Sequence, residues 1–207
     1  MSAELTFYTN PMSRGRIVRW MLEEIGVPYR TVNLDFGAAM KAPDYLAINP
    51  MGKVPAIRHG DTVVTECAAI CAYLADAFPE AGLAPPAGDR GAYYRWMFFT
   101  AGPLEMASAI NALGFAIPED KRGMIGCGSL AEVTDTLERA VTAMPYIAGD
   151  RFSAADVYVG AHIGWALMTD SIEKRQALAD YWERLSKRDA YRRASTLDDE
   201  LMASTPA

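Results

Sequence analysis

The first part of the chain alternates between short apolar segments and segments whose apolar residues recur at helical spacing. Leu5 to Thr9 has the length and apolar character of a strand, and Arg14 to Ile25 then carries apolar residues on one helical stripe. Gly26 and Pro28 end this predicted helix. Tyr29 to Leu34 alternates between apolar and polar residues, as a strand does. Two strands separated by one helix predict a parallel βαβ unit.

Further short segments complete this first pattern. A weak helical segment lies near Tyr45 to Ile48. Pro55 to Ile57 and Thr62 to Val64 resemble strands, and the sequence His59-Gly60-Asp61 between them predicts a hairpin turn. Cys67 to Phe78 again places apolar residues on one helical stripe. The order βαβ-α-ββα is that of a thioredoxin-like domain.

The pattern changes after residue 83, and no strand is recognisable beyond it. Prolines and a glycine in residues 84–89 predict a linker. Residues 90–116 are helical in pattern, with a kink expected around Gly102-Pro103. Two capping boxes, Ser129 with Glu132 and Ser153 with Asp156, open further helices.

The expected fold is therefore an α/β thioredoxin-like N-terminal domain over residues 1–83, followed by an all-α C-terminal domain over residues 90–207. The polar tail after about Asp198 is expected to fray.

Composition limits the cellular compartment and the class of partner that we expect. The 207 residues are 51% hydrophobic and carry a formal net charge of −6, with no basic run longer than two residues, which argues against a nucleic-acid partner. No apolar stretch has the length of a membrane span, and no secretory signal is recognisable. The chain has three cysteines, and an odd number is typical of a protein whose thiols stay reduced. We therefore expect a cytoplasmic protein without a membrane partner.

The most informative chemistry surrounds Val54 and Pro55. Proline lacks an N–H, so a cis Val54–Pro55 bond at the first position of a strand is the expected solution. It would turn the Val54 backbone outward, where its N–H and C=O can pair with an extended peptide. Glu66 and Cys67 then open a helix whose first N–H groups attract a carboxylate. This combination predicts a receptor for a small acidic peptide thiol.

These segments resemble a known family. Asn49 to Pro55 and Thr65 to Ile70 are similar to the glutathione-binding half of cytosolic glutathione transferases. Tyr8 to Arg14 and Phe152 to Asp156 extend the resemblance over nearly the whole chain, toward bacterial-type members with a serine-like active-site loop. The resemblance implies the glutathione transferase fold, glutathione as co-substrate, no metal, and a homodimer pairing the first domain of one chain with the second domain of its partner.

Three residues are candidates for activating the thiol, which is a poor nucleophile until it ionises. Ser13, at the apparent N-cap of the first helix, matches the catalytic serine of serine-type members, although serine is also a favoured cap for local reasons. Tyr8 is the rival, because some members use a tyrosine at the end of the first strand. Arg14 stands where certain bacterial members carry a catalytic cysteine; this argues against a cysteine mechanism, and the arginine could instead lend positive field to the thiolate.

The resemblance also assigns residues to glutathione itself. Val54 and Pro55 would present the backbone, and Glu66 would hold the α-amino group, although an acid in a first helical turn also complements the helix dipole. Cys67 replaces the usual serine; its backbone N–H can still meet a carboxylate, whereas its thiol is a weak donor. Lys53 is assigned to the glycyl carboxylate, with a solvated loop lysine as the alternative.

The electrophile should bind in an apolar pocket between the two domains. The candidates are Met12, Tyr94, Phe98, Met106 and Trp165. Apolar side chains at helical spacing are more often core residues, so for most of them the core is the competing interpretation. His59 and His162 have no neighbour in sequence that suggests a metal site or a catalytic triad.

The leading hypothesis is a glutathione transferase that conjugates the glutathione thiolate to small apolar electrophiles, as in detoxification. A non-catalytic stress or assembly factor with the same fold is one alternative, and a glutathione-dependent isomerase or peroxidase is another. The thiol site serves all of these, so the sequence leaves the reaction and the electrophile open.

Overall fold

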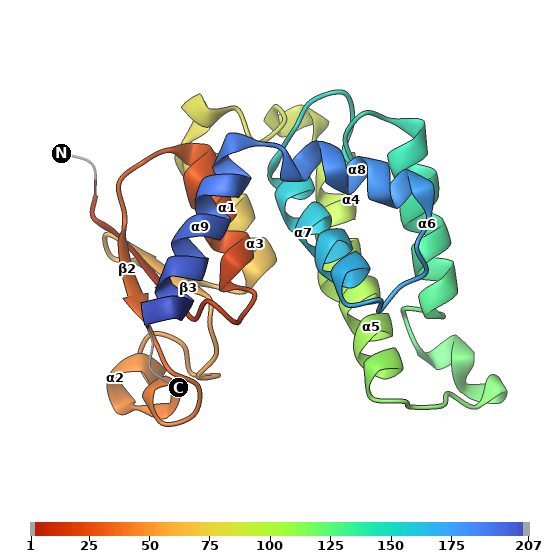
Figure 1. Ribbon diagram of the computed structural model, residues 1–207, viewed down its shortest axis with the longest axis horizontal. Coiled ribbons are helices and arrows are strands. Elements are labelled where there is room, and N and C mark those ends of the chain that lie inside the picture. Colours follow the sequence, from red (N-terminus) through yellow and green to blue (C-terminus); the bar gives the residue numbers. More distant parts are fainter. Residues whose placement is uncertain (1–2, 205–207) are drawn as a thin grey trace. The chain divides into compact units, whose positions relative to one another are not determined.

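The computed structural model describes residues 3–204 (Figure 1), and their contacts divide the chain into two compact units. The first unit joins the residues up to Leu83 with those from Lys187 onward, and the second is Ala84–Ser186. The sequence-based division placed all of residues 90–207 in the second domain, whereas the final helix makes its contacts with the first unit.

A four-stranded mixed sheet forms the centre of the first unit. Its strands are β1 (Leu5–Thr9), β2 (Arg30–Asn33), β3 (Ala56–His59) and β4 (Thr62–Thr65), in the order β2-β1-β3-β4. β1 pairs in parallel with β2 and antiparallel with β3, which pairs antiparallel with β4 across the predicted hairpin turn. The βαβ unit and the hairpin are therefore confirmed.

Helices cover this sheet. α1 (Gly15–Ile25) joins β1 to β2, a short 3-10 turn η1 (Ala39–Lys41) and α2 (Pro43–Leu46) follow β2, and α3 (Cys67–Ala77) follows β4 with a second 3-10 turn, η2 (Pro79–Ala81). α1 and α3 pack against each other and against the sheet. Side chains alternate along a strand, so Phe7, which is fully buried, and Tyr8 point to opposite faces of the sheet. The predicted thioredoxin-like domain is confirmed.

The last helix, α9 (Asp189–Ser204), packs along α1, as Figure 1 shows. Asp198 is fully buried, and its Oδ1 lies 2.7 Å from Nε of Arg19, which is also buried. Arg188 places two guanidinium nitrogens 2.6 and 2.7 Å from the carboxylate oxygens of Glu24. The prediction that the chain frays after Asp198 is wrong as far as Ser204, because α9 continues to that residue and the ion pair of Asp199 with Arg16 holds part of this polar segment. The rest of the predicted tail, residues 205–207, lies outside the described residues.

The second unit is helical, as predicted. Its elements are η3 (Ala87–Asp89), α4 (Gly91–Phe99), η4 (Thr100–Leu104), α5 (Glu105–Ala112), η5 (Glu119–Met124), α6 (Leu130–Ala143), α7 (Ala154–Met168) and α8 (Gln176–Ser186). The expected kink is a π-helical turn, η4, that contains Pro103 between α4 and α5. Within Ala84–Ser186 there is no strand, only an isolated bridge between Tyr146 and Gly149. No helix among residues 3–204 is long and apolar enough to cross a membrane.

Both predicted capping boxes are confirmed. At α6, the Ser129 N–H donates to Glu132 Oε2 over 2.8 Å, and the Glu132 N–H returns a bond to the Ser129 hydroxyl. At α7 the partner is Asp156, which is fully buried. Burial raises the pKa of the Asp156 carboxyl, and the hydrogen bonds that it accepts oppose this effect.

Candidate functional site

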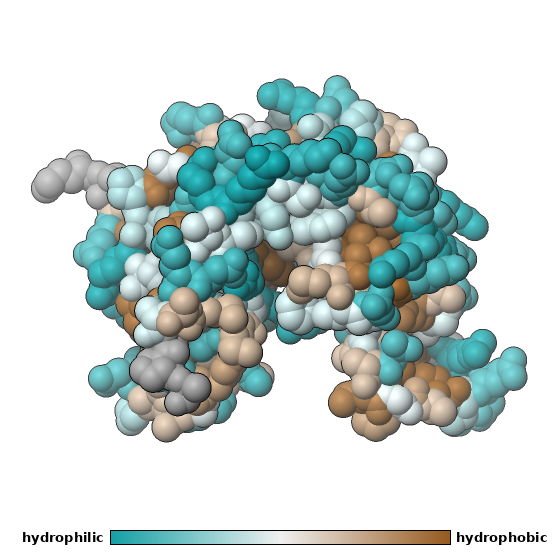
Figure 2. Space-filling model, viewed as in Figure 1, coloured by the Kyte–Doolittle hydropathy of each residue, from teal (hydrophilic) through white to brown (hydrophobic). Residues whose placement is uncertain are grey.

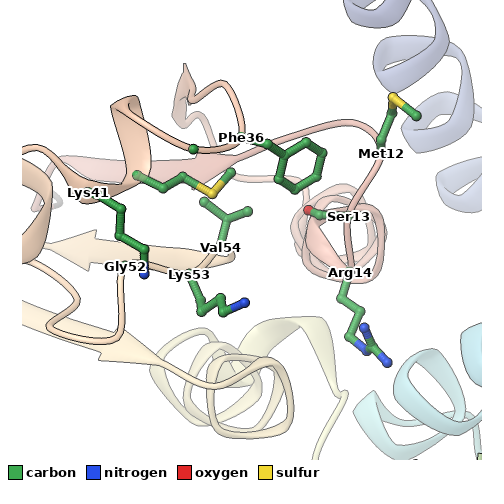
Figure 3. A pocket seen from close by; sticks show the side chains of 10 residues that line it. Met12, Ser13, Arg14, Phe36, Lys41, Gly52, Lys53 and Val54 are labelled. Carbon is green, nitrogen blue, oxygen red and sulfur yellow. The ribbon is translucent and has the colours of Figure 1, made fainter. Parts of the chain in front are cut away.

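A pocket of about 310 Å³ lies in the first unit (Figure 3). Three segments line it: the loop after β1, the segment after β2, and the loop before β3. The loop after β1 contributes Ser13, and the loop before β3 contributes Val54. The structure thus brings together two segments that the sequence analysis assigned to one peptide-thiol site.

The charged side chains that line this pocket are all basic. Its charged lining residues are Arg14, Lys41 and Lys53, all exposed, and none of the lining residues is acidic. The chain as a whole carries a formal net charge of −6, so the basic lining is a local feature. A concave site lined by one sign of charge attracts ligands of the opposite sign, here an anion such as a peptide carboxylate.

Lys41, which the sequence patterns do not single out, is placed by the neighbouring loop. Its ammonium group donates to the Met51 carbonyl oxygen over 2.8 Å. Gly52 has a φ of +56°, and a Cβ there would come within 2.5 Å of the Met40 carbonyl oxygen and 2.8 Å of Lys41 Nζ. Glycine is therefore required at position 52, both for its backbone conformation and for the passage of the Lys41 side chain.

The Val54–Pro55 peptide is cis, as expected, and Pro55 is buried. The carbonyl oxygen of the preceding Lys53 accepts hydrogen bonds from Tyr45 Oη at 2.6 Å and Asn49 Nδ2 at 2.8 Å. Among the described residues, neither the N–H nor the C=O of Val54 has a hydrogen-bond partner. The Val54 backbone is therefore available to an extended peptide, whereas its neighbour is anchored in the protein.

Asn10 organises the loop that carries Ser13, a role that sequence analysis did not identify. It is buried; its Nδ2 donates to the Leu34 carbonyl oxygen over 2.9 Å, and its Oδ1 accepts from the Met12 N–H over 2.9 Å. Its own carbonyl oxygen accepts from both the N–H and the hydroxyl of Ser13, at 3.0 and 2.7 Å. The signal for this role was local, since asparagine side chains commonly bond the backbone two residues later.

Ser13 is not the N-cap of α1, which corrects the sequence-based placement. The helix begins at Gly15, and Arg14 occupies the cap position without a side-chain cap bond. The Ser13 hydroxyl instead accepts from the Gly15 N–H over 2.9 Å while it donates to the Asn10 carbonyl oxygen. In Figure 3 this hydroxyl faces Phe36 and Val54, whereas the Arg14 guanidinium extends away from them.

Tyr8, the rival of Ser13, is not among the residues that line the pocket. Its ring packs against Tyr45 with centroids 5.7 Å apart. Burial raises the pKa of Tyr45 to about 12, so this neighbour stays neutral at physiological pH.

Glu66 and Cys67 open α3, as predicted. Glu66 is exposed and occupies the N-cap with φ 65° and ψ 118°, a backbone conformation that residues with a side chain rarely adopt. Cys67 is buried, and its thiol lies 3.7 Å from the Arg14 carbonyl oxygen, to which it donates. The cysteine side chain therefore ties the start of α3 to the loop that carries Ser13.

All five electrophile candidates are exposed, so the competing interpretation as core residues is wrong. Their exposed fractions are 71% for Met12, 44% for Tyr94, 70% for Phe98, 46% for Met106 and 61% for Trp165. Met12 lines the pocket beside Ser13, as does Phe36, which sequence analysis missed and which is 58% exposed. The other four belong to the second unit. Leu113 and Phe115, which follow α5, are also exposed, and Figure 2 shows hydrophobic surface on the second unit.

Both histidines have structural partners. His59 Nδ1 lies 3.0 Å from Tyr73 Oη. His162 donates from Nδ1 to the Tyr158 carbonyl oxygen over 2.8 Å, and its Nε2 lies 2.8 Å from a carboxylate oxygen of Glu105. Residues 3–204 contain no group of three or more His, Cys, Asp or Glu side chains that could hold a metal ion.

Comparisons with known proteins agree with this arrangement. A family model described as "Glutathione S-transferase, N-terminal domain" matches residues 3–76. Glutathione S-transferase F10 of Arabidopsis thaliana is 30% identical, over 92% of this chain and 96% of that protein. The crystal structure of a glutathione transferase from Methylococcus capsulatus is 30% identical with a TM-score of 0.78, over 94% of this chain and 98% of the other. A glutathione transferase homologue from Sulfitobacter, solved with bound glutathione, is 27% identical with a TM-score of 0.75, over 97% of this chain and 99% of the other.

Proposed function

Because this chain belongs to the glutathione S-transferase family and is a glutathione transferase, we propose that it binds glutathione in the pocket of the first unit and transfers the thiolate to small apolar electrophiles. One observation carries the proposal. The Ser13 hydroxyl, the unpaired Val54 backbone and a basic lining without acids share a single cavity of about 310 Å³. These are the groups that an acidic peptide thiol requires.

Each part of glutathione has a proposed partner in the first unit. The Val54 N–H and C=O pair with the backbone of the cysteinyl residue. The γ-glutamyl carboxylate is held by the N–H groups at the start of α3, Cys67 included, and Glu66 pairs with the α-amino group. Lys53 and Lys41 face the glycyl carboxylate.

We assign thiolate activation to Ser13, in a serine-type loop like that of bacterial members. Its hydroxyl donates to the Asn10 carbonyl oxygen, so it must rotate to donate to the sulfur of bound glutathione. The exchange is favourable because a hydrogen bond to a thiolate is charge-assisted and stronger than one to a neutral carbonyl. Arg14 adds positive field, and Tyr8 lies outside the pocket lining.

The electrophile is proposed to contact Met12 and Phe36, the exposed apolar residues next to Ser13. The exposed side chains Tyr94, Phe98, Met106 and Trp165 are proposed to supply further apolar contacts. Large exposed apolar side chains gain free energy when an apolar ligand removes them from water, at about 25 cal/mol per Å².

Calorimetry with glutathione tests the proposal, followed by turnover assays on a panel of apolar electrophiles. Heat of binding together with conjugation supports it. An absence of binding heat would favour the non-catalytic stress or assembly factor. Binding with turnover only of hydroperoxides, or only of isomerisable substrates, would move the assignment to a glutathione-dependent peroxidase or isomerase.

Neutralising the lysines should weaken glutathione binding in a salt-dependent way. Each of Lys41→Gln and Lys53→Gln is expected to raise the Kd for glutathione about two- to fivefold, because an exposed ion pair contributes roughly 0.5–1 kcal/mol. The loss should shrink as salt is raised from 0.05 to about 0.5 M, since salt screens exposed charges. Lys121→Gln, in the second unit, is the matched control, and an equal loss in this variant would contradict the assignment.

We further propose a cytoplasmic homodimer, as the family resemblance implies. Sedimentation velocity at micromolar concentration should then give a single species of twice the mass of the chain. A single monomer would remove this part of the proposal. The three cysteines are buried and free, and free thiols support the proposal of a reducing compartment.

A further inference from the structure

We infer that Arg16 is a positioning residue for the Ser13 loop, and that it holds this loop against the C-terminal helix α9. The inference rests on the proposed function, because it concerns the geometry of thiolate activation. The observation that carries it is a three-way contact. The Arg16 guanidinium donates from Nε to the Pro11 carbonyl oxygen over 2.6 Å, and from one terminal nitrogen to Asp199 Oδ1 over 2.6 Å.

The loop leaves little freedom for Ser13 once this contact is made. Consecutive carbonyl oxygens of the loop each accept a specific donor: that of Thr9 from the Leu34 N–H, and that of Asn10 from Ser13. The next carbonyl, that of Pro11, accepts from Arg16. Of these donors, Arg16 is the one whose side chain is also bound to α9.

The other end of the contact is a fixed anchor. Asp199 follows Asp198, whose buried ion pair with Arg19 holds α9 on α1. The same terminal nitrogen of Arg16 also lies 3.1 Å from Met202 Sδ, one turn further along α9. Arg16 therefore connects the loop to a helix that is itself held by buried contacts.

An arginine is required for this connection. A guanidinium presents several N–H donors in a planar fork and can serve a carbonyl and a carboxylate at once, whereas an ammonium is a point charge on a flexible stem. A cation in the first turn of a helix is disfavoured by the helix dipole, so local propensity does not explain Arg16.

The test uses the full chain with glutathione bound. Arg16→Lys and Arg16→Met should raise the pKa of the bound thiol, read from thiolate absorbance against pH, by about 0.5–1 unit, and lower kcat near neutral pH about tenfold, as small misplacements of catalytic groups do. The KM for glutathione should change less than twofold, because the residues proposed to bind it are untouched. Arg193→Met is the matched control: it breaks an ion pair between the same two helices, at Glu23, without touching the loop.

A double-mutant cycle separates positioning through Ser13 from a general loss of stability. In a Ser13→Ala background, Arg16→Met should cause no further shift of the thiol titration, because the group that it positions is gone. If the two substitutions shifted the thiol pKa additively, the inference would be overturned. It would also be overturned if the thiol bound to the Arg16 variants titrated as in the parent, at temperatures where all variants are folded. If the parent chain itself does not lower the thiol pKa of glutathione, the proposed function fails, and the inference fails with it.

Discussion

Asp156→Asn is expected to lower the free energy of unfolding by about 2–4 kcal/mol, because it leaves one buried backbone N–H facing an amide nitrogen, makes the neighbouring hydroxyl reverse its hydrogen bond, and removes the charge assistance of the carboxylate. The carboxylate accepts four hydrogen bonds. Oδ1 accepts from the Ile147 N–H and from Tyr181 Oη, each at 2.8 Å. Oδ2 accepts from the N–H and hydroxyl of Ser153, at 2.9 and 3.1 Å. An asparagine has one acceptor oxygen, so its amide nitrogen would face one of these donor pairs.

Urea denaturation followed by tryptophan fluorescence measures this effect, since Trp96, Trp165 and Trp182 all lie in the second unit. Tyr181→Phe removes a single donor from the same carboxylate and should cost only about 1 kcal/mol. Glu132→Gln changes the corresponding residue of the exposed capping box on α6 and should have a smaller effect than Asp156→Asn. If the two capping-box variants were equally stable, the buried network at Asp156 would not be the main support of α7.

Ser13→Ala is expected to raise the pKa of the thiol of bound glutathione by about one to two units. The lost charge-assisted hydrogen bond contributes roughly 1.5–3 kcal/mol to the stability of the thiolate. Turnover near neutral pH should fall about ten- to hundredfold, in line with the smaller thiolate fraction. Affinity for glutathione should change little, because Val54, Glu66 and the lysines are untouched. The measurement is the thiolate absorbance of the complex against pH, with turnover on the same samples.

Two variants decide which hydroxyl acts. Ser13→Thr keeps a hydroxyl at the same carbon and should restore most of the activity, whereas Tyr8→Phe should leave the titration unmoved. The opposite pattern would move the role to Tyr8. A fall in turnover with an unchanged thiolate pKa would mean that Ser13 shapes the loop through Asn10 and Gly15 without activating sulfur.

Local sequence patterns were sufficient for the elements that depend on neighbouring residues. The apolar stripe of α1, the turn at Gly60 and the two capping boxes involve residues within a few positions of one another, so their spacing predicts them. Ser13 was misplaced for the same reason. Its bond to the Gly15 N–H imitates a cap bond within one turn, and only the backbone angles show that the helix begins later.

Contacts between distant residues could not be predicted in this way. Arg16 and Asp199 are 183 positions apart, and nothing in the polar composition of the tail indicates that Asp198 is buried. The exposure of Phe98 and Trp165 could not be predicted either. An apolar residue on a helix gives the same sequence pattern whether it faces a core or a ligand. Lys41 is a site residue because the loop at Gly52, 11 positions later, folds beside it, and nothing in the local sequence indicates this contact.

The backbone conformation of Glu66 lowers the stability of the fold at a residue that is proposed to bind the ligand. A non-glycine residue in a sparsely populated conformation costs of order 1–3 kcal/mol, and here the residue that carries this cost is the one proposed to hold the amino group of the ligand. A thermostability screen alone would therefore favour a glycine at position 66, where the absence of a side chain relieves crowding. Laboratory evolution of this protein needs a ligand-binding step in each round, because heat selection by itself would discard a recognition residue.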